Sequence, residues 1–196
     1  MSFELLRWVA LTLVLAGTFL LVALWRFPSA VTKIYVRRFG KRLGTPPWNQ
    51  LQGGALLHPG TDHVVRSSPD ILNMFGVYDV SAEPARVRCF VPDWDAYWSI
   101  SLYAWNTENF YVLNDRMTKP GALELIIVGP GGHHQKKGNE TVVMAPTARG
   151  VIVLRAVVKN REDTEEVARM QELVQRSTIT RYSETGEDPS NPRAAG

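Results

Sequence analysis

The sequence predicts a mainly β protein, with an antiparallel β-sandwich or jelly-roll-like domain, a C-terminal helix and one N-terminal transmembrane helix. Three observations predict this class. An uncharged apolar segment of membrane-spanning length comes first, short β-like runs separated by turn residues fill the middle of the chain, and an amphipathic helical pattern follows them. We therefore divide the chain into an anchor at 1–27, a basic juxtamembrane helix at 28–44, a β-rich domain at 45–182 and a disordered tail at 183–196.

The anchor is predicted from the eighteen uncharged residues WVALTLVLAGTFLLVALW between Arg7 and Arg26. At about 1.5 Å per residue, a helix of this length nearly crosses a hydrocarbon layer of about 30 Å. Trp8 and Trp25 lie at its two ends, and tryptophan rings favour the membrane interface. A cleaved signal peptide is the alternative, but the apolar segment is longer than such peptides usually have, so we expect an uncleaved single-pass anchor.

After the anchor, Pro28 and Ser29 are expected to end the first helix and to begin a second one. The second helix would place Val31, Ile34 and Tyr35 on one face and its cations on the others, which is the pattern of a helix that lies on anionic lipid. A solvated linker helix is the alternative. The residues predicted to lie at the membrane interface are Trp8, Trp25, Lys33, Arg37, Arg38, Lys41 and Arg42.

The net charge of +3 comes from a short segment and not from the globular domain. Residues 26–42 contain six cations and no acidic residue, whereas the chain from Leu43 onward contains fifteen Lys and Arg against eighteen Asp and Glu. A nucleic-acid-binding domain needs its cations on the folded surface, so this distribution argues against nucleic acid and favours a lipid bilayer as partner. Taken alone, the excess of cations after the span places the domain in the cytoplasm.

Alternation and turn spacing predict the β-rich domain. The run ARVRCFV alternates, and further β-like runs are NFYVL, LELIIVG, TVVMA and GVIVLRAVV, with turn-forming Pro and Gly between them. No helical pattern of real length comes between Arg86 and Val158, which favours an antiparallel sandwich or barrel over a parallel α/β sheet. The preceding stretch TPPWNQLQGGALLHPGTDH is expected to be irregular.

The C-terminal helix is predicted over TEEVARMQELVQRS, with Asp163 as its N-cap and Glu166 completing a capping box. Val167, Met170 and Val174 form an apolar stripe along this helix. We expect the stripe to pack on the sheet, in preference to a partner helix.

The densest aromatic run is DWDAYWSISLYAWNTENFYVL, which places seven aromatic residues within the 21 positions 93–113. As a strand, it puts Trp98, Ile100 and Leu102 on a core face. The opposite face carries an aromatic row, which is our candidate for a ligand or partner surface because amphipathic aromatics favour interfaces. Cover by a helix or loop of the same chain is the alternative. The row consists of Tyr97, Ser99, Ser101, Tyr103 and Trp105.

A second candidate is the densest run of hydrogen-bonding side chains outside the tail, Arg66, Asp70, Asn73 and Asp79. We expect these residues to form either a buried structural network or the polar end of a ligand pocket.

No residue in the sequence can be named as catalytic. The lone Cys89 permits neither a disulfide framework nor a cysteine-based metal site, and the adjacent His133 and His134 would point in opposite directions on a strand. Asp93 and Asp95 are explained more simply as turn residues than as an acid/base pair. Because nucleophile, phosphate-loop and zinc motifs are missing, we predict no cofactor and no metal, and we favour binding over catalysis.

An ordered series of motifs extends from about residue 64 to residue 180. They are Arg66, Asp79-Val80-Ser81 with Pro84, Val91-Pro92-Asp93, Tyr97-Trp98, Asn109-Phe110, Gly129-Pro130-Gly131 and Ala145-Pro146-Thr147. In this order the motifs resemble those of the bacterial domain-of-unknown-function family 1254. The resemblance implies a mostly β domain, common in envelope or membrane-anchored proteins and often joined to a second β-rich domain of family 1214. It implies no established reaction.

The leading hypothesis is a single-pass protein of the bacterial inner membrane whose domain binds a separate β-rich membrane or envelope protein resembling family 1214. We find no second domain of that kind in the sequence and therefore expect it on another chain. The alternatives are a binding domain for an apolar or carbohydrate-like small molecule and an envelope enzyme of unknown reaction. The resemblance to exported proteins places the domain on the periplasmic side, opposite to the charge rule.

Overall fold

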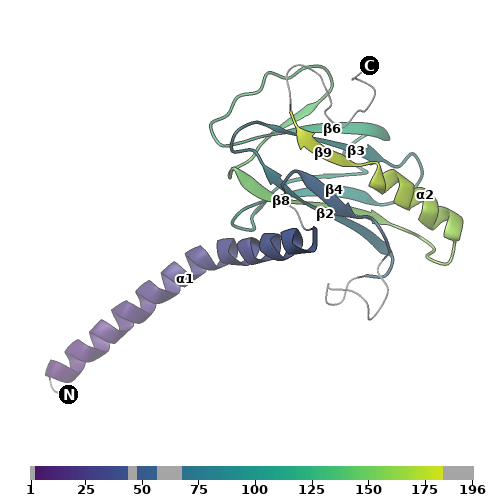
Figure 1. Ribbon diagram of the computed structural model, residues 1–196. Helices are drawn as coiled ribbons and strands as arrows, with labels where there is room; N and C mark the ends of the chain where they lie inside the picture. Colours follow the sequence, from purple (N-terminus) through teal and green to yellow (C-terminus); the bar gives the residue numbers. More distant parts are fainter. Residues whose placement is uncertain (1–2, 44–47, 57–67, 183–196) are drawn as a thin grey trace.

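The computed structural model describes residues 3–43, 48–56 and 68–182. Within these residues, nine strands form two sheets that pack face to face, a short helix lies against the sandwich, and a long N-terminal helix projects away from it (Figure 1). The predicted class, a β-sandwich with a C-terminal helix after an apolar N-terminal helix, is confirmed.

The two sheets differ in their strand pairing. Sheet A has five strands, all antiparallel, in the order β1 (Gln50–Gly53), β2 (Ile71–Asp79), β8 (Arg149–Val157), β4 (Trp98–Ala104) and β5 (Asn109–Asn114). Sheet B has the order β7 (Thr141–Met144), β6 (Gly121–Val128), β3 (Ala85–Val91) and β9 (Thr178–Arg181), and its β6–β7 pair is parallel. The segment after residue 44, predicted to be irregular, supplies strand β1.

The sandwich is closed on one side and open on the other. β1 and β9, which are edge strands of different sheets, contact each other. The remaining edges, β5 of sheet A and β7 of sheet B, therefore lie on the opposite side. On that side, no described strand pairs with the outer edge of β5 or with that of β7.

The core between the sheets follows the alternation in the sequence. Trp98, Ile100 and Leu102 of β4 are fully buried, as are Val87 and Cys89 of β3. Because successive strand residues point to opposite faces, these side chains meet in one layer about 10 Å thick. Burial raises the pKa of the Cys89 thiol to about 12, so this cysteine is inert in the folded domain.

Helix α2 (Thr164–Gln175) closes one end of this core. Met170 and Val174 are fully buried, which confirms that the apolar stripe packs on the sheets. Asp163 caps the helix as predicted, because its carboxylate accepts the backbone N–H groups of Glu165 and Glu166. The predicted capping box is wrong: the Glu166 carboxylate accepts the N–H groups of Lys159 and Asn160 and so holds the loop before the helix.

Helix α1 (Phe3–Leu43) is one continuous helix of 41 residues, so the predicted break at Pro28 and Ser29 is wrong. Proline removes a backbone hydrogen bond inside a helix and usually kinks it. Figure 1 shows that α1 changes direction between its outer part and the turns near the domain. The Thr32 hydroxyl donates to the Pro28 carbonyl at 3.2 Å, which adds a side-chain bond in the turn that follows the proline.

The last turns of α1 pack on the outer face of sheet A. Thr32 and Val36 are each 4% exposed, although nothing in the helix itself would cover them. The Tyr35 ring contacts the Phe75 ring of β2 edge to face, with centroids 6.4 Å apart. The predicted apolar face of this segment is therefore divided, because Tyr35 contacts the domain whereas Val31 and Ile34 are 43% and 52% exposed.

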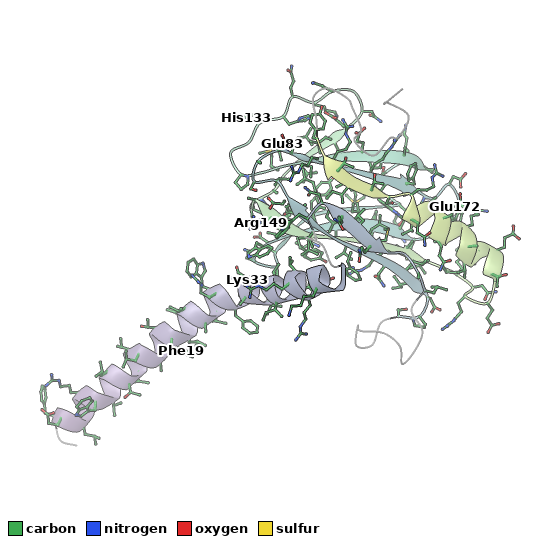
Figure 2. The ribbon with its side chains drawn as sticks, viewed as in Figure 1. Phe19, Lys33, Glu83, His133, Arg149 and Glu172 are labelled. Carbon is green, nitrogen blue, oxygen red and sulfur yellow. The ribbon has the colours of Figure 1, made fainter. Side chains whose placement is uncertain are left out.

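The outer part of α1 is long and apolar enough to cross a membrane, by length and composition. Trp8 and Trp25 are exposed, and so is Phe19, which points away from every other described segment (Figure 2). The Thr12 and Thr18 hydroxyls donate to the backbone carbonyls of Trp8 and Val14. These bonds satisfy the hydroxyl donors, which would be unfavourable in lipid without a partner.

We expect Val36→Asp to release the last turns of α1 from sheet A, because burying a carboxylate against an apolar face costs about 2 kcal/mol or more. Hydrogen exchange of the α1 amides after Pro28, measured on the full chain in detergent, should accelerate. Ile34→Asp is the matched control, because it places the same charge on the exposed side of the same turn. Equal exchange in the two variants would contradict the packing.

Candidate functional site

The structure divides the predicted aromatic row into three parts. All five residues belong to one face because Trp98, Ile100 and Leu102 between them point into the core. Ser99 and Ser101 are only 2% and 5% exposed, Tyr97 is 46% exposed, and Tyr103 and Trp105 are half-buried. The row is therefore no continuous platform: its middle is covered, one end is open and the other end joins a second cluster.

Trp105 belongs to a tryptophan cluster, which we define as Trp48, Asp79, Trp105, Thr147 and Arg149. The two indole rings lie 6.3 Å apart, and the Arg149 guanidinium lies 4.7 Å from the centroid of the Trp48 ring. The backbone N–H of Trp105 donates to the Thr147 hydroxyl at 2.9 Å, which in turn donates to the Arg149 carbonyl at 2.7 Å. The cluster joins ends of β2, β4 and β8 to the start of β1.

Asp79 is the charged centre of the tryptophan cluster. Its carboxylate lies 2.8 Å from Arg149 Nε and accepts the backbone N–H of Ser81 at 3.0 Å and the Ser81 hydroxyl at 2.5 Å. Partial burial raises the pKa of Asp79, but the hydrogen bonds from Ser81 and the Arg149 charge lower it by more, so the net pKa lies below its usual value. Asn49 exchanges two hydrogen bonds with the Asp79 backbone and adopts φ +54°, a conformation that asparagine tolerates.

The hydrogen-bond donors and acceptors of the cluster bond mainly to one another. The cluster therefore holds these strand ends together. Behind it, the buried Tyr78 hydroxyl donates to the Tyr103 carbonyl at 3.3 Å. Burial raises the pKa of Tyr78 to about 12, against a smaller lowering by its hydrogen bond with Thr147. Gly150 permits this approach, because a Cβ there would lie 2.2 Å from both the Tyr78 hydroxyl and the Tyr103 carbonyl.

Several predicted motifs meet at this same end of the sandwich. The Val80 N–H donates to the Ala148 carbonyl and the Ala145 N–H donates to the Val128 carbonyl, both at 2.8 Å. Glu83 and His133 line a cavity of about 270 Å³ between the β2–β3 loop and the Gly129–Gly132 turn, on the side away from Glu172 of α2 (Figure 2). No hydrogen bond joins Glu83 to His133 among the described contacts.

The second predicted set is not brought together. Arg66 lies outside the described residues. Asn73 and Asp79 are both on β2, six positions apart, which separates them by about 20 Å in a strand. The Asn73 amide donates to the nearby Ile71 carbonyl at 3.3 Å, and Asp70 uses its backbone carbonyl to accept the Val158 N–H at 2.9 Å. The side chains of Asn73 and Asp79 therefore serve separate local contacts.

The two adjacent histidines lie in the loop between β6 and β7 and have different surroundings. His133 is exposed, whereas His134 is buried and its Nε2 lies 2.7 Å from Glu140 Oε1. The His134 ring also packs edge to face on Tyr182, with centroids 4.6 Å apart. His58 and His63 lie outside the described residues, and within the described ones no three His, Cys, Asp or Glu residues are grouped as metal ligands would be.

Asp93 and Asp95 do not form a pair either. Asp95 is exposed and bonds to Lys159 Nζ at 2.5 Å, and this hydrogen bond and charge lower its pKa. Two cavities of about 420 and 430 Å³ flank α2, and both are lined by Trp94 and Arg169, whose guanidinium lies 3.8 Å from the Trp94 ring centroid. The charged residues Asp95, Lys159 and Glu166, which line one of them, are already engaged with the chain itself.

The model of the family described as "Protein of unknown function (DUF1254)" matches residues 48–177, about two thirds of the chain. The chain belongs to this family. The match confirms the resemblance drawn from the motifs, and it starts at Trp48 of the tryptophan cluster. No curated protein matches the sequence.

The DUF1254 domain is also similar to solved structures. The crystal structure of the VPA0106 protein from Vibrio parahaemolyticus aligns with TM-score 0.61 and 15% identity, over 86% of this chain and 42% of that chain. This chain thus spans less than half the length of that protein, and the likeness concerns the fold alone. A protein from Burkholderia cenocepacia aligns more weakly, with TM-score 0.42, 22% identity, and cover of 57% of this chain and 32% of that chain.

The buried His134–Glu140 pair gives a pH test of the DUF1254 domain. Burial raises the pKa of Glu140, but hydrogen bonds from the Lys137 N–H and His134, with the charges of His134 and Arg86, lower it by more. A carboxyl whose folded pKa is depressed stabilises the fold above its unfolded pKa and loses that contribution as the pH falls through the folded value. We expect the melting temperature to fall as the pH drops from about 5 to about 3.

In Glu140→Gln, the melting temperature should be lower at neutral pH and its acid dependence should be shallower. Glu162→Gln, at an exposed position, is the control. Parallel acid profiles for the wild type and Glu140→Gln would show that the pair contributes nothing to the acid dependence.

Proposed function

We propose that this protein is a single-pass bacterial inner-membrane protein whose DUF1254 domain recognises a separate β-rich membrane or envelope protein. The observation that carries the proposal is the continuity of α1, which runs from the apolar segment directly onto sheet A. A helix that both crosses the membrane and packs on the domain leaves no flexible tether between them.

The spacing supports a domain held at the membrane surface. The uncharged segment ends at Trp25, and Thr32 is already buried against the domain. These positions are about 10 Å apart along a helix. A domain held so close to the bilayer meets membrane-bound partners at a high effective concentration, and so modest contacts suffice for pairing.

The charges on the last turns of α1 support contact with lipid. Lys33, Arg37, Arg38 and Lys41 are exposed, while the packed face carries Thr32 and Val36. Anionic headgroups attract such cations by about 1 kcal/mol for each one near the surface. In this proposal they hold α1 and the domain in one orientation on the bilayer.

The comparison with a longer protein supports the pairing. In the VPA0106 protein, more than half of the chain lies outside the part that this chain matches. We infer that the DUF1254 fold works beside further protein, and that here a separate chain resembling family 1214 supplies it. A small-molecule site is less favoured in the cavity beside Lys159, because its charged residues Asp95, Lys159 and Glu166 already bond to the chain itself.

Crosslinking in spheroplasts tests both the pairing and its side. We propose that the domain is periplasmic, so a membrane-impermeant amine-reactive reagent should capture the partner on the full-length chain as efficiently as a permeant one. The captured peptides should belong to one β-rich protein at constant stoichiometry. Capture by the permeant reagent alone would place the domain in the cytoplasm, and recovery of the uncrosslinked monomer with both reagents would overturn the pairing.

A further inference from the structure

The exposed apolar side chains of the domain gather on the open side of the sandwich. Among its described residues, four large apolar side chains are prominently exposed. Tyr97 precedes β4, Val112 lies in β5, Met117 follows β5, and Met144 ends β7. All four thus belong to the side where β5 and β7 are the free edges, opposite to the side that β1 and β9 close.

β5 is an unprotected edge strand. It pairs with β4 on one side, and none of the described strands pairs with its other side. Soluble proteins usually protect such an edge with a charge, a proline or a covering segment. The sequence of β5, NFYVLN, contains neither a charged residue nor a proline. Its backbone N–H and C=O groups are therefore available to another strand.

The side chains next to this edge form an open surface continuous with it. Val112 lies directly opposite Ser101 of β4, on the outer face of sheet A, and is 41% exposed. The Met117 N–H donates to the Asn114 carbonyl in the turn after β5, and the Met117 side chain is 65% exposed. This is the open end of the aromatic row, where Tyr97 lies.

Three cations around this surface have no ion-pair partner among the described residues. Arg116 and Lys119 lie in the turn after β5, and Arg155 of β8 is opposite Ser99. The acidic side chain of the same turn, Asp115, accepts the Trp98 N–H at 3.3 Å. The nearby Asp95 is already neutralised by Lys159. A partner with acidic side chains next to its own strand would complement this rim.

We propose that β5 is the docking edge of the domain, and that it extends sheet A by one strand from an acidic, β-rich partner chain. The proposal rests on the pairing proposed above and names its surface. Main-chain hydrogen bonds along β5 would supply affinity, while Val112, Met117 and Tyr97 would select apolar side chains and the three cations would select acidic ones.

The test adds substitutions at this edge and measures partner capture by affinity pull-down of the full-length chain in detergent, because an added or removed lysine would itself change amine-reactive crosslinking. Val112→Lys places a charge on the exposed face of β5 and should reduce partner capture about tenfold, since edge lysines oppose strand addition. Thr178→Lys is the matched control, because it places the same charge at an exposed position of the edge strand β9 on the closed side, and should leave capture unchanged. The charge reversal Arg116→Glu with Lys119→Glu should also reduce capture.

The outcomes separate this inference from the proposed function. If the wild type captures a partner and Val112→Lys captures as much, the docking edge is overturned while the pairing stands. If the wild type captures no partner, the pairing itself fails. Capture of only further copies of this chain would overturn the inference in favour of self-association. Should Val112→Lys lower the melting temperature, Met117→Lys in the exposed turn replaces it, and equal capture by that variant would overturn the inference.

Discussion

The last turns of α1 bury Thr32 and Val36 and pack on the outer face of sheet A, where the Tyr35 ring contacts the Phe75 ring. Fully burying one valine stabilises a fold by about 1.5 kcal/mol or more, so this contact is a substantial share of a stability of about 5–15 kcal/mol. It also fixes the orientation of the sandwich relative to α1. Because α1 continues unbroken through Pro28, any tilt of its apolar outer part is transmitted to the sandwich.

The outer face of sheet A therefore serves three purposes along its width. α1 covers it near β2, where Tyr35 meets Phe75. At one end the tryptophan cluster joins the strands through the Asp79–Arg149 ion pair. Near β5 the face stays open, and its apolar side chains remain exposed.

Local sequence patterns predicted several strands, whereas the features that depend on contacts distant in sequence were not predicted. The alternation in ARVRCFV and GVIVLRAVV identified β3 and β8, because one face of each is in the core. β2 was not predicted, because its half-buried outer face also carries the apolar Ile71 and Phe75, so Ile71–Asp79 shows little alternation. The tryptophan cluster was missed since Trp48 and Arg149 are about a hundred residues apart, although the isolated Trp48-Asn49 pair in a Pro-rich stretch was a usable signal. Proline at position 28 suggested a helix end, but packing on sheet A favours an unbroken helix.

The rigid connection between α1 and the sandwich is tested most directly by a distance measurement between them. Spin labels at Arg37→Cys on α1 and Thr178→Cys on β9 would be compared in detergent and in lipid bilayers, with the buried Cys89 left unlabelled. A domain that is rigidly packed on α1 gives one narrow distance distribution that is the same in both environments. A broad distribution, or one that changes between detergent and lipid, would show that the domain moves relative to α1 and would contradict the rigid connection.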